Sequence, residues 1–462
     1  MPVADSATSS PDAPEPVHGE SSLDQPLTLN GVAASIDDLR ALEAQARRVV
    51  ESARRYLPDL PFLGDNKPPA AEKPAAPRDP QTERPAKAPV ADAPQAPVIK
   101  ATASDLARLF ANNFDRLDSD GDGFVSEAEI DRAMASSKFK GVDALLVDVL
   151  KRHRRELQSL SNDEWGPETN GVSRADMKEF EALCRSGSKV ELVQDVDKTL
   201  QRAQQSLDRA TCREAFSNPA NPLESIKPEA IIQGRIQDSS FLAALASLAK
   251  NNPQAVAGMI KDNGVNGSGD RTYTVTFPGD PDHPLTVTAP TDAELGRYAS
   301  ATKYGAWPAI LEKAFGAYSG DTTVHQDALE ESIRSRKAMR ALNTGGVDID
   351  FISFTNDDEL DQKMWQAMLD KVPVTARISH EFGSLFGLAD DRTDDAGLPC
   401  GQEYSVLAYD SKTKTVTLRN PRGYGEPVNK DGTVRDGKND GVFTMTLDEF
   451  QKNFTEVAYG QV

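Results

Sequence analysis

The stretch Gln233-Gly-Arg-Ile-Gln-Asp-Ser-Ser-Phe-Leu-Ala-Ala-Leu-Ala-Ser-Leu248 predicts a polar loop that leads into a buried helix. The residues up to Asp238 indicate a turn that ends in a helix-capping residue. From Phe241 onward the sequence is apolar on nearly all sides, which is typical of a helix buried on every face. We therefore expect Ser239 at the helix N-terminus, where unpaired N–H groups and the helix dipole stabilise negative charge.

The composition predicts a soluble protein of two or three domains with a disordered part. The chain has 462 residues, 38% of them hydrophobic, and a mean hydropathy of -0.52. Its net charge of -20 argues against nonspecific binding to nucleic acid or to an anionic membrane surface. The chain has three cysteines, an odd number at scattered positions. This pattern argues against a disulfide framework and favours a reducing compartment.

The N-terminal sequence has neither the basic nor the apolar region of a cleavable secretion signal, and no apolar run is long enough to span a bilayer. These features fit a cytoplasmic protein, or one exported without a cleavable signal peptide, as bacterial effectors are. Residues 1–100 are rich in Pro, Ala and Ser, and we expect them to be disordered. One amphipathic helix is predicted within this region, over residues 35–57, and residues 58–99 read as an extended linker.

A second decisive stretch is Asp118-Ser-Asp-Gly-Asp-Gly-Phe-Val-Ser-Glu-Ala-Glu129, which matches the calcium-binding loop of an EF-hand. Gly123 stands where the loop turns sharply, and hydrophobic residues flank the loop where an EF-hand packs. Oxygen donors at this spacing select Ca²⁺. The expected ligands are the side chains of Asp118, Asp120, Asp122, Ser126 and Glu129 and the main-chain carbonyl of Phe124.

EF-hands usually occur in pairs, and a degenerate partner follows this loop. Helical patterns over residues 141–160 and Arg174–Arg185 flank it, and Val172 aligns with Val125. That alignment puts Asp176 at the twelfth loop position but no carboxylate at positions 1, 3 and 5, which hold Trp165, Pro167 and Thr169. A metal-free structural partner is therefore the favoured reading. The alternative is a longer, irregular metal loop that uses Asp163, Glu164, Glu168 and Asn170.

Several segments in the last 240 residues resemble motifs of the calpain family of cysteine proteases, in the family's order. The first stretch resembles Gln-Gly-x-x-Gly-Asp-Cys-Trp-Phe-Leu-Ala-Ala, and Gly401-Gln-Glu-Tyr-Ser-Val406 resembles Gly-His-Ala-Tyr-Ser-Val. The other matching segments are Trp307–Phe315, Ala341–Gly346, Val416–Gly423 and Asp440–Phe450.

This resemblance implies an α+β fold with a papain-like, two-subdomain calpain core over residues 217–462. A helical subdomain would precede an antiparallel-sheet subdomain, and alternating residues in Thr272–Phe277 and Thr413–Leu418 independently predict strands. The predicted order of domains is then the disordered region 1–100, an all-α EF-hand pair over 101–190, a helical connector over 191–216 and this core.

The resemblance also assigns roles to four positions. Ser239 stands where the family has its nucleophilic cysteine, and Gln402 where it has the histidine base. Asn420 stands where an asparagine orients that histidine, and Gln233 where a glutamine amide contributes to the oxyanion hole. The family activity is calcium-dependent cysteine-type endopeptidase activity. Serine needs a base more than cysteine does and glutamine cannot serve as one, so we expect proteolysis to be lost.

Three functions from different classes remain open. The leading hypothesis is a calcium-responsive regulatory pseudoprotease that binds an extended peptide or protein in the family's cleft. The second is an active calcium-dependent endopeptidase with a rearranged site that uses Ser239 or Cys400 with His380. The third is a calcium sensor for which the core is only a scaffold.

Overall fold

The computed structural model describes residues 101–163, 170–186, 190–319, 328–378, 397–399, 401–429 and 431–461, and the backbone of 28–29 and 32–33. Residues 1–63 and 64–462 form two units. In the first unit, the short strands β1 (Thr28–Leu29) and β2 (Val32–Ala33) pair antiparallel. The helix predicted over 35–57 and the linker predicted over 58–99 lie outside the described residues.

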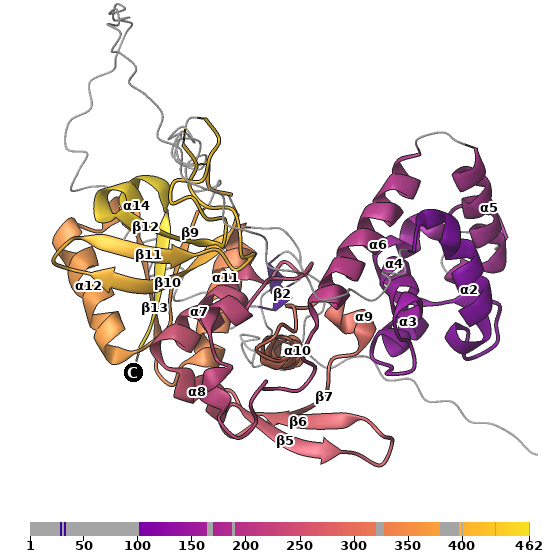
Figure 1. Cartoon of the computed structure of the whole chain (residues 1–462), viewed down its shortest axis with the longest axis horizontal. Coiled ribbons are helices and arrows are strands. Elements are labelled where there is room, and N and C mark those ends of the chain that lie inside the picture. Colours follow the sequence, from indigo (N-terminus) through magenta and orange to yellow (C-terminus); the bar gives the residue numbers. More distant parts are fainter. Residues whose placement is uncertain are drawn as a thin grey trace, which may run out of the picture. The chain divides into compact units, whose positions relative to one another are not determined.

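The second unit begins with a helical module that spans residues 103–209 (Figure 1). Its helices share one hydrophobic core, and the strands β3 and β4 pair antiparallel with Val125 opposite Val172. The elements of the module are α2 (Ala103–Leu117), β3 (Phe124–Val125), α3 (Glu127–Met134), α4 (Val142–Leu157), β4 (Val172–Ser173), α5 (Arg174–Arg185) and α6 (Glu191–Arg209).

Helix α6 differs from the helical connector expected over 191–216. It belongs to the module, because its apolar face joins the module's core through residues such as Leu200. The helix also ends at Arg209, seven residues earlier than the sequence predicts. The reason is tertiary: the main-chain oxygens of Glu214 and Ala215 accept hydrogen bonds from the N–H groups of Ala306 and Trp307, which holds this segment outside the helix.

The rest of the unit combines helices with antiparallel sheets, so the fold is α+β. Its first part contains η1 (Pro222–Glu224), η2 (Pro228–Ala230), α7 (Ser239–Asn251), α8 (Pro253–Gly258), the three-stranded sheet β5 (Ile260–Val265), β6 (Arg271–Val275) and β7 (Leu285–Thr288), then α9 (Asp292–Leu295), α10 (Trp307–Ser319) and α11 (Ala328–Leu342). Helix α7 lies at the centre, as its sequence predicts: all residues from Phe241 to Ala249 are buried, against α11 and the strands β9 and β10 (Figure 1).

The second part is a six-stranded antiparallel sheet with the strand order β12-β11-β10-β9-β13-β8. Its elements are β8 (Val347–Phe351), η3 (Ile352–Phe354), α12 (Asp357–Asp370), β9 (Val374–Arg377), β10 (Glu403–Asp410), β11 (Thr415–Arg419), β12 (Val442–Thr446), α14 (Leu447–Asn453) and β13 (Glu456–Gly460). The strands expected over Thr272–Phe277 and Thr413–Leu418 correspond to β6 and β11.

The two faces of this sheet differ in chemistry. Tyr404 and Val406 point to the face that packs against α12 and α14 in an apolar core. Glu403 and Ser405 alternate with these residues along β10. They therefore point to the opposite face of the sheet, toward α7, because side chains alternate along a strand. Ser247 of α7 fixes the helix to this face: its hydroxyl donates to the Val406 carbonyl oxygen and accepts from the Val374 N–H, both at 2.9 Å.

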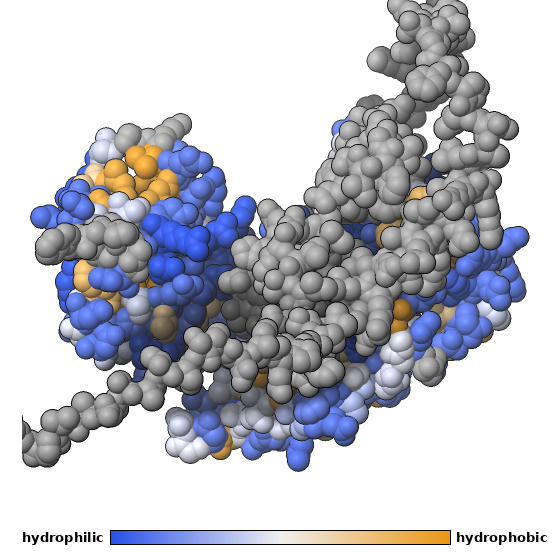
Figure 2. Space-filling view, turned by 180° about the vertical axis from the view of Figure 1, so that it is seen from behind, coloured by the Kyte–Doolittle hydropathy of each residue, from blue (hydrophilic) through white to orange (hydrophobic). Residues whose placement is uncertain are grey.

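Among the described residues, no helix is both long and apolar enough to cross a membrane. Hydrophilic residues cover most of the visible described surface, and hydrophobic residues gather on one face of the helical module (Figure 2).

Candidate functional site

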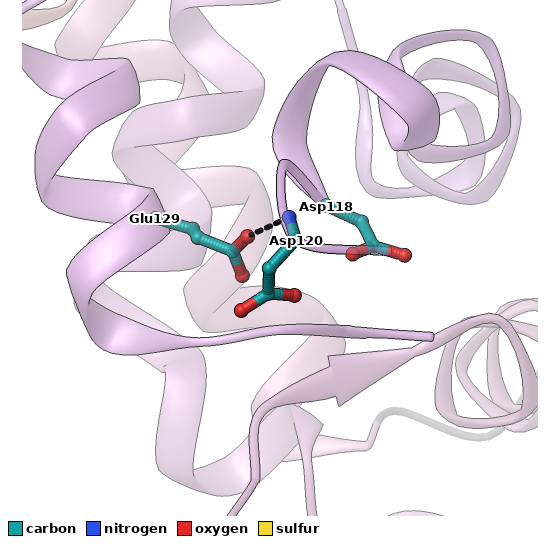
Figure 3. Close-up of side chains that lie close together, drawn as sticks. All are labelled: Asp118, Asp120 and Glu129. Atoms are coloured by element: carbon teal, nitrogen blue, oxygen red, sulfur yellow. Dashed lines mark hydrogen bonds between the residues drawn. The ribbon is translucent and has the colours of Figure 1, made fainter. Parts of the chain in front are cut away.

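Residues 118–129 comprise the loop after α2, the short strand β3 and the first turn of α3, and three carboxylates converge there (Figure 3). Asp118, Asp120 and Glu129 each place one oxygen within 4.8 Å of the others. The side chain of Glu129 is buried, with 1% of its surface exposed. Gly123 has φ +94°, a conformation that favours glycine, so this residue permits the sharp turn.

Hydrogen bonds hold Glu129 over the loop. Its Oε1 accepts from the Ser119 N–H at 2.7 Å, and its Oε2 accepts from the Ser126 N–H at 2.9 Å. Burial alone would raise the pKa of Glu129, but these hydrogen bonds outweigh burial and leave the pKa below its ordinary value. The carboxylate is therefore ionised at neutral pH, as a metal ligand must be.

The segment around β4 and the start of α5 repeats this arrangement with a shorter side chain. Asp176, in the position that corresponds to Glu129, accepts from the Ser161 N–H at 2.9 Å and from the Ser173 N–H at 2.8 Å. Of the residues proposed above for the second loop, Asp163 and Asn170 are described, whereas Glu164, Trp165, Pro167, Glu168 and Thr169 lie outside the described residues.

The positions singled out in the C-terminal part come from three segments. Ser239 is the first residue of α7, and its Oγ accepts a hydrogen bond of 3.4 Å from the Glu403 N–H at the start of β10. Gln402, the preceding residue, is buried, and its Nε2 donates to Gln233 Oε1 at 3.1 Å. The Gln233 N–H donates to the Pro421 carbonyl oxygen at 2.8 Å, next to Asn420.

Asn420 does not share a hydrogen bond with Gln402. Its Oδ1 accepts from the Arg422 N–H at 3.0 Å, and its Nδ2 donates to the Gly425 carbonyl oxygen at 3.4 Å. The side chain of Asn420 thus stabilises its own turn.

The described histidines are engaged elsewhere. His153, in α4, shares a 3.0 Å hydrogen bond with Thr199, and His283 shares one of 2.6 Å with Asp280. His380 and Cys400, the residues of the rearranged-site hypothesis, lie outside the described residues. Among the described side chains with a hydrogen bond to Ser239, Gln402 or Gln233, no histidine is found to act as a base.

A family model described as calpain family cysteine protease matches residues 188–461. The chain belongs to the calpain family of cysteine proteases. No curated protein matches the chain. The calpain-family match begins just before α6 and covers the whole segment that holds Gln233, Ser239, Gln402 and Asn420.

One buried feature of this calpain-family domain was missed by the sequence analysis. Asp238 is the N-terminal cap position of α7, but its side chain makes no capping hydrogen bond. Its carboxyl group instead forms a hydrogen bond with the carboxyl group of Glu312 on α10, which also accepts from the Ala299 N–H at 2.5 Å. Two carboxyl groups can bond in this way only if one carries a proton.

Burial raises the pKa of Asp238 to about 7, although the hydrogen bond from Glu312 opposes the rise. Burial and the nearby Asp238 charge raise the pKa of Glu312 well above its ordinary value. The expected capping role of Asp238 was therefore wrong, because a buried carboxyl partner from α10 competes for its side chain. Local sequence carries no signal for that partner.

A second missed feature involves Ser240, the residue after Ser239, and Glu403, the first residue of β10. Ser240 and Glu403 replace the tryptophan and the alanine of the calpain motifs, and both contact Ser335 of α11. The Ser335 Oγ lies 3.1 Å from the Ser240 Oγ and 2.5 Å from Glu403 Oε2. The other carboxylate oxygen of Glu403 accepts from the Thr375 hydroxyl at 2.5 Å. At the position of the motif's tryptophan, the half-buried Ser240 is thus joined to the buried hydroxyl group of Ser335 and the buried carboxylate of Glu403.

This network continues across the sheet as a row of buried charges. Arg377 on β9 stands opposite Glu403 on one side and opposite Glu456 of β13 on the other. Burial raises the pKa of Glu456, with Arg377 and Arg336 opposing the rise and the charge of Glu403 adding to it. The departures at Ser240 and Glu403 were the available sequence signals, but only the fold shows that they meet.

Proposed function

We propose that this calpain-family protein is a proteolytically inactive member that acts as a calcium-responsive binding protein. The observation that carries the proposal is the pair of residues at the family's nucleophile and base positions. Ser239 accepts a hydrogen bond from a main-chain N–H, and Gln402 donates its amide to Gln233. Among the described residues, neither side chain has a hydrogen bond to a histidine or a carboxylate that could serve as a base.

The loss of catalysis follows from the chemistry of the two side chains. A serine hydroxyl is essentially undissociated near neutral pH and attacks a carbonyl only when a base removes its proton. The glutamine amide has no proton-accepting nitrogen. Without nucleophile and base, an oxyanion hole and binding leave only about 10³- to 10⁴-fold acceleration over water. That acceleration is negligible for peptide-bond hydrolysis.

We propose that residues 101–190 form an EF-hand pair with one calcium site. Asp118, Asp120, Asp122, Ser126 and Glu129 with the carbonyl of Phe124 would hold Ca²⁺. The clustering of three carboxylates and the pairing of β3 with β4 support this assignment. The second half, with the shorter Asp176, would be its metal-free structural partner.

The partner we propose is an extended peptide or protein segment, the class of ligand that papain-like domains bind. The net charge of -20 argues against nucleic acid as that partner.

A calcium titration tests the calcium half of the proposal. Calorimetry on the full chain should show binding at one site, and limited proteolysis should show calcium-dependent protection that extends beyond residue 190. The Glu129→Gln variant should lose both responses. Heat of binding that persists in Glu129→Gln would contradict the assigned site, and protection confined to residues before 190 would contradict a calcium-responsive core.

A further inference from the structure

The side chain of Arg235 connects the loop that carries Gln233 to the helical module. Arg235 lies two residues after Gln233, and its guanidinium group forms an ion pair with Asp148 of α4. Both side chains are shielded from water: 1% of Asp148 and 13% of Arg235 is exposed.

A second arginine completes this ion pair. The Arg297 Nη1 lies 3.5 Å from Asp148 Oδ1. The carboxylate oxygens of Asp148 accept no hydrogen bond from another described group, so these two guanidinium groups are its described source of compensation. A buried charge that loses its partner is strongly unfavourable, and here the loss of one carboxylate would leave two cations facing each other.

Arg235 also binds main-chain oxygens: its Nη1 donates to the Thr199 carbonyl oxygen of α6 at 3.4 Å, and two of its other donors bind the segment that carries Arg297. Its N–H donates to the Arg297 carbonyl oxygen at 2.7 Å, and its Nε donates to the Gly296 carbonyl oxygen at 3.0 Å. Gly234 approaches the same segment so closely that a Cβ there would lie 2.0 Å from the Arg297 oxygen. The loop is therefore seated on residues 296–297, and Asp148 holds both arginines of this seat.

The module also contacts the family domain at places that do not touch this loop. Asp292 accepts from the Gly141 N–H at 2.9 Å and pairs with Arg213. The Thr291 hydroxyl donates to the Met134 carbonyl oxygen at 2.6 Å. These contacts provide a control, because their loss would weaken the same interface without removing the partner of Arg235.

We infer that Asp148 is a positioning residue for the Gln233 loop, so that the helical module sets the geometry of the site at the N-terminus of α7. Asp148 acts through Arg235 and touches none of the four positions in the site. The inference rests on the contacts within residues 103–461 and not on calcium binding, so failure of the calcium proposal leaves it intact.

The test uses the full chain with Ser239→Cys as a reporter thiol. Two readouts are compared in this background and after adding Asp148→Asn, Arg235→Lys or Asp292→Asn. The first is amide hydrogen exchange in residues 233–238. The second is the pH profile of alkylation of the introduced thiol by iodoacetamide, which reports the thiol pKa and therefore the state of the N-terminal turn of α7.

Asp148→Asn should speed exchange in residues 233–238 by about tenfold or more, because the cost of breaking a buried ion pair exceeds that factor. The alkylation profile should move to higher pH as the N-terminal turn loosens. Arg235→Lys, which keeps the charge but loses the planar donor group, should change both readouts in the same direction and by less. Asp292→Asn should change neither.

Unchanged exchange and an unchanged pH profile in Asp148→Asn would overturn the inference, as would equal changes in Asp292→Asn. If Asp148→Asn does not fold, Arg235→Lys decides, and its failure to alter either readout would overturn the inference.

Discussion

Ser240 and Glu403 show how single residues of this protein depart from the calpain motifs as a matched pair. Ser240 leaves the space of a tryptophan, and the larger side chain of Glu403 enters the place of an alanine. Ser335 contacts both residues through hydrogen bonds. A polar group in a buried position is tolerated when its hydrogen bonds are satisfied, so each replacement makes the other acceptable.

A double-mutant cycle tests this compensation. We expect Ser240→Trp alone to destabilise the protein by overpacking, and Glu403→Ala alone to destabilise it by removing the carboxylate that accepts from the buried Ser335 and Thr375 hydroxyl groups. The two changes together should cost less than their sum, by about 0.5–3 kcal/mol, the usual range for residues in one network. Unfolding by urea measures these free energies, and strict additivity would contradict the account.

The buried pair of Asp238 and Glu312 makes stability depend on pH. Folding raises the pKa of Asp238 from about 3.9 in the unfolded chain to about 7. Between these values the folded protein holds more protons than the unfolded chain, so the free energy of unfolding falls as pH rises. The contribution is fully present below about pH 4 and is lost as the pH passes through about 7.

The Asp238→Asn variant should remove much of this dependence, because its amide keeps a hydrogen bond to Glu312 and does not titrate. The slope contributed by one proton is at most about 1.4 kcal/mol per pH unit. Urea unfolding at intervals from pH 4.5 to 7.5 measures it, with Asp208→Asn, an exposed carboxyl on α6, as the control. Equal slopes in Asp238→Asn and the unaltered protein would refute the shared proton.

At the scale of elements, the sequence predicted what depends on neighbouring residues. The bounds expected for α5, Arg174–Arg185, are those in the structure, because Ser173 and Asp176 form a local capping box. The burial of α7 also followed from its own apolar residues. The early end of α6 and the engagement of Asp238 with Glu312 could not be predicted, because residues far along the chain determine both.

The candidate site likewise combines positions that local motifs assign with contacts that depend on residues far along the chain. The positions of Ser239, Gln402 and Gln233 could be assigned from motifs, and the structure brings them together through the start of β10 and the loop before α7. The polar face of the sheet behind them could not be foreseen. It requires the strand register that places Glu403, Arg377 and Glu456 in one row.

The loop between α2 and α3 carries an element-scale prediction. Calcium at about 100 times its dissociation constant should stabilise the folded protein by about 2.7 kcal/mol. In a domain of the module's size, 1 kcal/mol shifts the melting temperature by about 4–8 °C, so this stabilisation corresponds to a rise of roughly 10–20 °C. Glu129→Gln should abolish this rise, because Glu129 supplies a buried carboxylate to the loop.

Thermal unfolding with and without calcium measures the effect. Asp431→Asn is the matched control, since Asp431 is an exposed carboxylate outside residues 118–129 that accepts from the Thr433 N–H at 3.0 Å. Loss of the calcium effect in Asp431→Asn with retention in Glu129→Gln would show that the site was assigned to the wrong loop.

For the whole molecule, the described structure joins a helical module to a calpain-family domain through buried contacts. The module's core includes Ala293 of the family domain, and the ion pair of Asp148 with Arg235 links α4 to the loop before α7. A change in the module therefore has a physical route to the site that does not depend on catalysis. This arrangement suits a binding protein that responds to a signal in one part and acts through another.

The central claim is that this family member does not cleave peptide bonds. The most direct test is an endopeptidase assay on unfolded casein, with and without millimolar calcium, run on the full chain beside Ser239→Ala and the double variant Ser239→Cys, Gln402→His. The account predicts that the unaltered chain and Ser239→Ala are equally silent in both conditions. Calcium-dependent cleavage by the unaltered chain that disappears in Ser239→Ala would contradict it and would restore the hypothesis of a rearranged active site.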